Sequence, residues 1–192
     1  MNKTPEKTEG GWYHFDDYPE FKPNLSPREV FLMGAFGGTY WRPIFSGITN
    51  KFYKNQHKKY PESWWNGIPE ERLTSHLEQY NTTINSYKRK VGESLEFCET
   101  NGWATPQHPY GWFQWYCDFF SGERSQYDLK MVQRWVRNAG PRGGTRTWLI
   151  TLIRDNSGDY KDVTVGVNLR QSLLEWGYHL TNKDYEMRIK EL

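Results

Sequence analysis

The sequence has few of the residues from which common metal and catalytic sites are built. It contains only two cysteines, Cys98 and Cys117, which form no CxxC pair, and its five histidines are scattered without an HExxH motif. We therefore expect no metal site and no cofactor. No nucleophile elbow or similar local signature surrounds a serine or cysteine, so the residue patterns define no reaction.

Long apolar runs and a large net charge are also missing. No apolar segment approaches the length of a membrane span, and no hydrophobic region typical of a signal peptide occurs near the start. We expect an intracellular protein without a membrane partner, in the cytoplasm or nucleus of a cell or of an infected host. The formal net charge is only +2, so any attraction for nucleic acid has to be local.

Aromatic residues supply most of the apolar content. They make up 17% of the chain, while valine, isoleucine and leucine are sparse. The richest stretch is 102–122, where rings recur at spacings of three and four between residues 112 and 120. This spacing predicts a helix from Pro109 to Phe120 that is apolar nearly all round and therefore buried. The remaining rings are candidates for core or for binding surface.

Capping and stop signals predict a mainly α fold with little strand. Helices are expected at 26–35, 69–80, 92–100, 109–120, 125–138, 147–154 and 168–176, with a last one after Thr181. Extended segments are expected at 39–45 and 162–167. The predicted organisation is a single irregular multi-helix domain at 25–185 with aromatic-rich loops. A partly disordered N-terminal arm at 1–24 and a tail at 186–192 flank it.

Basic residues gather in three places that suit phosphate. Residues 51–60 interleave lysines with aromatic rings, and residues 88–90 form a second cluster. The third place is the glycine-rich turn at 140–146, where amides at a helix start and two arginines form a candidate anion site, or a plain helix–helix turn. The phosphate-binding candidates are Arg42, Lys54, Lys58, Lys59, Arg89, Arg134, Arg137, Arg142, Gly143, Gly144 and Arg146.

Aromatic and acidic side chains supply the other candidate site residues. Exposed rings among Trp41, Trp64, Trp65 and Trp112 would stack on bases. Asp118 lies within the aromatic helix, where an acid is either a partner of arginine or tryptophan or a group available for proton transfer. The candidates for catalysis are Asp118, Glu96 and His108.

Four strings resemble an uncharacterised protein family. They are FGGTYWRPI at 36–44, YPESWWNGIP at 60–69, KVGESLEF at 90–97 and PYGWFQWYCDFF at 109–120. The chain is similar over about 25–185 to hypothetical proteins of microbial eukaryotes and of large DNA viruses or phages. The resemblance implies one domain and a viral or planktonic source, and it carries no activity and no site residues.

The leading hypothesis is a nucleic-acid-binding protein that contacts DNA or RNA through basic clusters and stacking rings. One alternative is an enzyme that acts on a nucleotide or on modified bases in DNA, with phosphate held by the glycine-rich turn. Another alternative is a virion, assembly or protein-interaction component whose aromatic loops form an interface. The oligomeric state is left open by the sequence.

Overall fold

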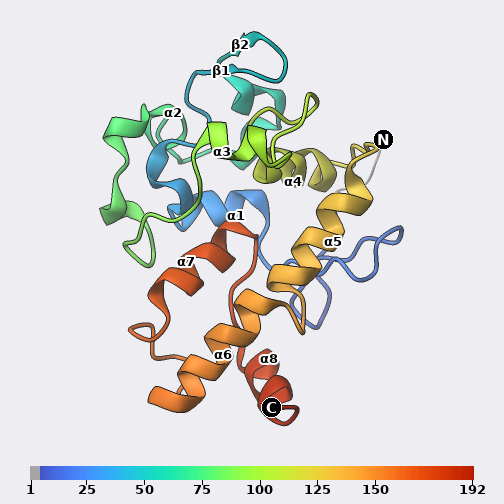
Figure 1. Cartoon of the computed structure of the whole chain (residues 1–192), viewed down its shortest axis with the longest axis vertical. Helices are drawn as coiled ribbons and strands as arrows, with labels where there is room; N and C mark the ends of the chain where they lie inside the picture. Colours follow the sequence, from blue (N-terminus) through green and yellow to red (C-terminus); the bar gives the residue numbers. More distant parts are fainter. Residues whose placement is uncertain (1–4) are drawn as a thin grey trace. The chain divides into compact units, whose positions relative to one another are not determined.

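The computed structural model describes residues 5–192 and is mainly α, with one small sheet (Figure 1). This confirms the predicted fold class. The chain forms two compact units, the first containing 27–124 and the second containing 5–26 and 125–192. The single domain predicted at 25–185 stays a prediction, and the part of the predicted disordered arm at 1–4 lies outside the described residues. No helix in the described part is long and apolar enough to cross a membrane.

Unit 1 consists of short helices and one hairpin. Its α-helices are α1 (Pro27–Leu32), α2 (Glu71–Thr74), α3 (Leu95–Thr100) and α4 (Trp112–Phe120), and its strands are β1 (Ile44–Ser46) and β2 (Lys51–Tyr53). Its 3-10 turns are η1 (Ala35–Gly38), η2 (Gln56–Lys59), η3 (Glu62–Trp64), η4 (Leu77–Gln79) and η5 (Thr82–Ile84).

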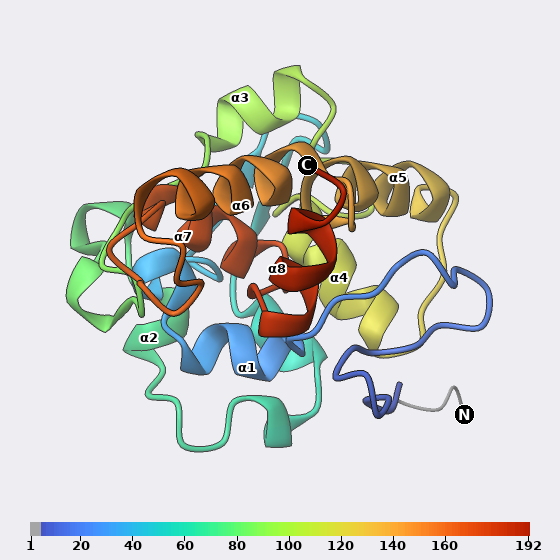
Figure 2. The ribbon, with the colours of Figure 1, turned by 90° about the horizontal axis from the view of Figure 1, so that it is seen from below.

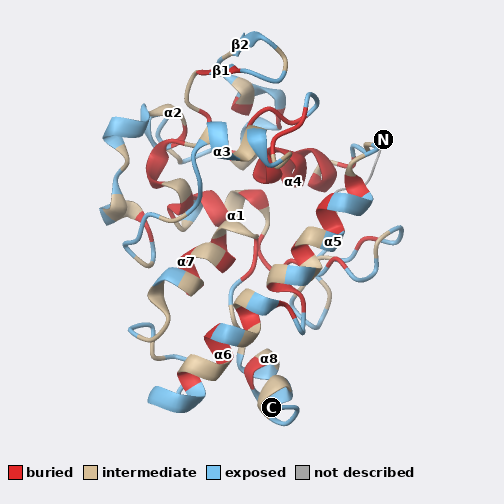
Figure 3. Cartoon of the chain, in the orientation of Figure 1, coloured by how far each residue is buried: buried red, intermediate tan, exposed pale blue. Residues whose placement is uncertain are grey.

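Helix α4 is the centre of this unit, as the ring spacing predicts. All nine of its residues are buried, which Figure 3 shows as an unbroken buried ribbon. Phe113 packs edge-on against Phe31 of α1, with ring centroids 5.5 Å apart. The helix begins at Trp112 rather than at Pro109, because Gly111 has a φ of 83° and interrupts the helical backbone.

Three other helices are shorter than the sequence predicts. The helix expected at 92–100 begins only at Leu95, because the Ser94 side chain caps it by accepting from the Phe97 amide. The helix expected at 69–80 breaks at Ser75, whose ψ of 149° is extended and whose amide donates to the carbonyl oxygen of Gly38. The helix expected to reach Ala35 ends at Leu32, and Gly34 follows it with a φ of 69°. At Ser75 a contact with a distant segment replaces a local helical hydrogen bond, which helix propensity does not predict. At the end of α1 the left-handed backbone of Gly34 ends the helix.

The extended segment near residue 44 is one arm of an antiparallel hairpin. Strands β1 and β2 pair Ile44 with Tyr53, Phe45 with Phe52 and Ser46 with Lys51. The hairpin lies at one edge of unit 1 (Figure 1). The second strand falls within the basic segment, where no strand was expected.

Unit 2 is built around helix α6. It contains α5 (Asp128–Ala139), α6 (Gly144–Asn156), α7 (Val167–Glu175) and α8 (Asn182–Ile189), and α6 contacts the other three (Figure 2). Phe21 from the N-terminal segment is buried here and meets Trp135 edge-on. The extended segment predicted at 162–167 is wrong, because residues 163–166 form turns and Val167 begins α7.

Candidate functional site

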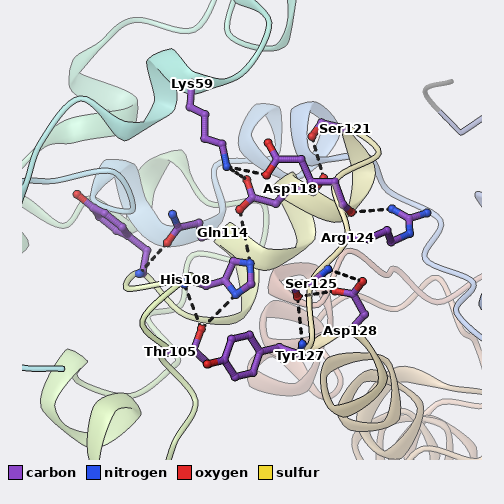
Figure 4. Close-up of polar contacts among 12 residues, drawn as sticks. Lys59, Thr105, His108, Gln114, Asp118, Ser121, Arg124, Ser125, Tyr127 and Asp128 are labelled. Carbon is purple, nitrogen blue, oxygen red and sulfur yellow. Dashed lines mark hydrogen bonds and ion pairs between the residues drawn. The ribbon is translucent and has the colours of Figure 1, made fainter. Parts of the chain in front are cut away.

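A buried polar cluster of unit 1 surrounds Asp118 of α4. Its carboxylate oxygen Oδ1 accepts hydrogen bonds from the Tyr60 hydroxyl at 2.7 Å and from Lys59 Nζ at 2.8 Å. Figure 4 shows Lys59 directed at Asp118, and Lys59 also donates to Glu123 Oε2 at 3.0 Å. The partners of Asp118 are therefore a lysine, a tyrosine and a histidine, so the expected arginine or tryptophan partner is wrong.

His108 and Asp118, two of the predicted catalytic residues, come together in this cluster. The second oxygen of Asp118 lies 3.6 Å from His108 Nε2, and His108 Nδ1 lies 3.2 Å from the Thr105 hydroxyl. Within the described residues no hydrogen bond or ion pair joins Glu96 to either of them, and Glu96 is exposed on α3. The exposed fractions of His108 and Asp118 are 0% and 3%, so the geometry is that of a structural network rather than of groups that meet a substrate.

Lys59 is part of this network rather than a free phosphate ligand. Burial lowers the pKa of its ammonium group, but the hydrogen bonds to Asp118 and Glu123 outweigh burial and raise the pKa above its ordinary value. Its side chain is 40% exposed and extends from the solvent to the buried carboxylate of Asp118. The expectation that Lys59 is available for phosphate is therefore wrong in this conformation.

Raising the pH above 10 should destabilise the protein partly through Tyr60. Burial, followed by the Cys117 thiol and the Asp118 carboxylate, raises the pKa of Tyr60 above its ordinary value of 10.0. A raised pKa in the fold means that this stabilisation is complete below pH 10 and is lost as the pH rises toward the folded pKa. Between about pH 8 and about pH 11, the free energy of unfolding in urea should fall less for Tyr60→Phe than for the parent protein. An equal loss in both proteins would contradict this role.

The glycine-rich turn at 140–146 joins α5 to α6 and is closely packed. A Cβ at Gly143 would overlap the backbone of Asn138, so close packing accounts for this glycine and no ligand is needed to explain it. Arg146 is buried and pairs with Asp184 at 2.7 Å, so the expectation that it faces phosphate is wrong. Arg142 is exposed and lies 3.3 Å from Glu191. The turn is better described as a helix–helix connection than as an anion site.

The tryptophans proposed for base stacking are mostly core residues. Trp41, Trp65 and Trp112 are buried, so the expectation that they are exposed is wrong. Trp64 is half-buried and stacks on Tyr60, with centroids 5.4 Å apart and an interplanar angle of 4°. These tryptophans already pack against neighbouring rings of unit 1. Most members of this aromatic cluster are therefore used within the core.

The remaining phosphate candidates differ in availability. Arg42 is half-buried and donates to the Thr39 carbonyl at 3.1 Å, and Arg134 is half-buried with its guanidinium 5.2 Å from the centre of the Trp176 ring. The structure does not bring all the candidates to one surface within a unit. Besides Lys59 and Arg142, which are exposed but have ion-pair partners, the exposed candidates are Lys54, Lys58, Arg89, Arg137 and Gly144.

The β1–β2 hairpin combines exposed rings with exposed lysines. Phe45 and Phe52 are 57% and 63% exposed, and Lys51 and Lys54 flank Phe52. Within residues 5–192 neither lysine has an ion-pair partner. Phe45 was not among the candidate residues. The sequence signal for this hairpin is a pair of short segments, Ile-Phe-Ser and Lys-Phe-Tyr, on either side of the turn Gly-Ile-Thr-Asn.

Comparison with known proteins adds no further constraint. No protein-family model, no curated protein and no solved structure matches the chain. The resemblance to hypothetical proteins of microbial eukaryotes and large DNA viruses or phages therefore stays a prediction. In the described part of the chain no group of three or more histidine, cysteine, aspartate or glutamate side chains is placed to hold a metal ion.

Proposed function

We propose that the protein binds nucleic acid at the β1–β2 hairpin and the turn that follows it. The supporting observation is the local charge: residues 42–59 carry Arg42, Lys51, Lys54, Lys58 and Lys59 without a single aspartate or glutamate. A local excess of lysine next to exposed rings is the composition that contacts phosphates and bases together. The net charge of +2 for the whole chain is compatible with this, because the attraction is concentrated in one segment.

Three lysines of this segment are positioned for phosphate contacts. Lys51 and Lys54 are exposed, and Lys58 is exposed with only a long 4.0 Å ion pair to Glu70. The site is thus defined by the lysines that the fold leaves available, and Lys59 is excluded because Asp118 holds it.

Binding should weaken steeply with salt. Three contacts to a single strand correspond to a slope of about −2 in log affinity against log salt concentration, because each contact releases about 0.7 counterion. Affinity should then fall about twentyfold between about 50 and about 200 mM salt. Fluorescence anisotropy of a labelled oligonucleotide measures this directly. Absence of binding at the lower salt concentration overturns the proposal.

The double variant Lys51→Gln/Lys54→Gln locates the site. It should reduce the salt slope by about 1.4, because two of the three contacts are lost. The matched control is Lys161→Gln/Lys183→Gln, which removes the same charge from exposed positions of unit 2 and should keep most of the parent slope. If the two double variants behave alike, the attraction is a bulk effect and the hairpin is not the site.

A further inference from the structure

The hairpin carries its apolar rings on the side that faces solvent. Directly opposed residues of an antiparallel pair project to the same face, so Phe45 and Phe52 share one face of the hairpin. The neighbouring pairs Ile44–Tyr53 and Ser46–Lys51 project to the other face, where Ile44 and Ser46 are buried. The solvent face of an antiparallel pair that covers a core is commonly polar. Here the exposed face is aromatic.

Hydrogen bonds fix the backbone that presents these rings. Glu99 of α3 accepts from the Ser46 hydroxyl at 3.0 Å and from the Gly47 amide at 2.9 Å. At the entry to the hairpin, the Tyr110 hydroxyl donates to the Arg42 carbonyl at 2.7 Å. The Tyr53 hydroxyl donates to Thr49 across the turn at 3.1 Å. The rings therefore project from an ordered support, which reduces the entropy lost when a ligand binds.

We propose that Phe45 and Phe52 stack on unpaired bases, so that the hairpin takes single-stranded nucleic acid in preference to duplex. This inference rests on the proposed function and names its substrate class. The choice of nucleic acid as the occupant of this face follows from the charge of the hairpin segment. Lys51 and Lys54 lie on either side of Phe52 in the chain and both are exposed, although Lys51 projects from the opposite face of the strand pair. The segment 42–59 has no carboxylate of its own, and the Glu99 carboxylate that meets the hairpin accepts hydrogen bonds from Ser46 and Gly47. In a duplex the base faces are already stacked, and only an unpaired base offers a face to a phenylalanine ring.

The side-chain chemistry also predicts weak dependence on base sequence. Phenylalanine has no hydrogen-bonding group, and every base has a face on which a ring can stack. Binding of oligothymidine and of mixed-sequence single strands should therefore differ little, apart from the stacking strength of the bases themselves.

The test compares a single strand of about 16 nucleotides with the duplex of the same sequence, using the parent protein and Phe45→Leu/Phe52→Leu. Leucine keeps an apolar side chain and removes the aromatic face. The parent should bind the single strand more tightly than the duplex. The double variant should lose about 25-fold or more in single-strand affinity, at about fivefold or more for each ring, and should keep most of its duplex affinity.

Each outcome separates the two proposals. If the parent binds both ligands equally and the leucine variant is unchanged, base stacking is wrong and electrostatic binding stands. If neither ligand binds, the proposed function itself fails. A third outcome would be that the parent self-associates, that the leucine variant is monomeric, and that neither protein binds single strands. In that case this face is a protein interface and the inference is overturned. Thermal unfolding of the variants should match the parent, because both rings are exposed.

A cross-linking experiment gives a second readout that does not depend on affinity. An oligonucleotide that contains 5-iodouridine should cross-link on irradiation to the hairpin, and mass spectrometry should find the adduct at Phe45 or Phe52. Adducts confined to other rings of the protein would contradict stacking at the hairpin even if single strands bind.

Discussion

Replacing Asp118 with alanine should destabilise unit 1 by about 2 to 4 kcal/mol, less than the loss of a fully buried ion-pair partner, because the Lys59 side chain is 40% exposed and keeps its ion pair with Glu123. The substitution removes the acceptor of the Tyr60 hydroxyl and the buried partner of Lys59, and it leaves a buried hydroxyl without this hydrogen bond. His108 loses the carboxylate 3.6 Å from its ring as well. The free energy of unfolding in urea, followed by tryptophan fluorescence, measures the loss.

Glu123 provides a matched control for this prediction. It binds the same lysine at 3.0 Å, but its side chain is 47% exposed, so Glu123→Ala should change the free energy of unfolding by less than about 1 kcal/mol. Asp118→Asn should fall between the two, because the amide keeps a neutral acceptor for Tyr60 and loses the charge. Equal effects of Asp118→Ala and Glu123→Ala would show that the buried cluster is not a stabilising centre.

The sequence predicted those parts of the structure that depend on local spacing. The rings of α4 recur every three or four residues, and this pattern alone identified a buried helix. The start of α5 was predicted only approximately, because the helix begins at Asp128 rather than at Ser125. The Ser125 amide donates to Asp128 Oδ2 at 2.9 Å, but the Asp128 amide donates to the Ser125 carbonyl, so only half of the expected reciprocal cap forms. The predicted cap of α8 is confirmed, because the Thr181 hydroxyl oxygen accepts from the Asp184 amide at 3.2 Å.

The candidate site depended on contacts that local patterns do not encode. The acid of α4 was noticed, but its partners Lys59 and Tyr60 are more than fifty positions away in the sequence, and no spacing rule joins them to Asp118. The exposure of a ring is equally non-local. Trp41 and Phe45 are four positions apart, yet the first is completely buried and the second is 57% exposed. The composition indicated that a site would use aromatic rings and lysines. Which of these side chains face solvent became clear only from the register of the hairpin.

Gly34 should be among the glycines of unit 1 that are most sensitive to substitution. It follows α1 with a φ of 69°, a conformation that costs an ordinary residue about 1 to 2 kcal/mol. A Cβ at this position would also overlap the carbonyl of Ile84 in η5. The approach is fixed by the Ser86 amide, which donates to the Met33 carbonyl at 2.9 Å, so the two backbones have little freedom to separate. Overpacking adds about 1 to 3 kcal/mol, and Gly34→Ala should therefore destabilise the protein by about 2 to 5 kcal/mol in urea unfolding.

Gly67→Ala separates the two contributions. Gly67 has a φ of 80°, but a Cβ there would meet no other atom within 4 Å. This substitution should cost only about 1 to 2 kcal/mol, which is the backbone strain alone. The difference between the two variants measures the close contact of the α1–η1 connection with η5. If Gly34→Ala is no more destabilising than Gly67→Ala, the two segments can move apart without loss, and the packing at this junction does not stabilise unit 1.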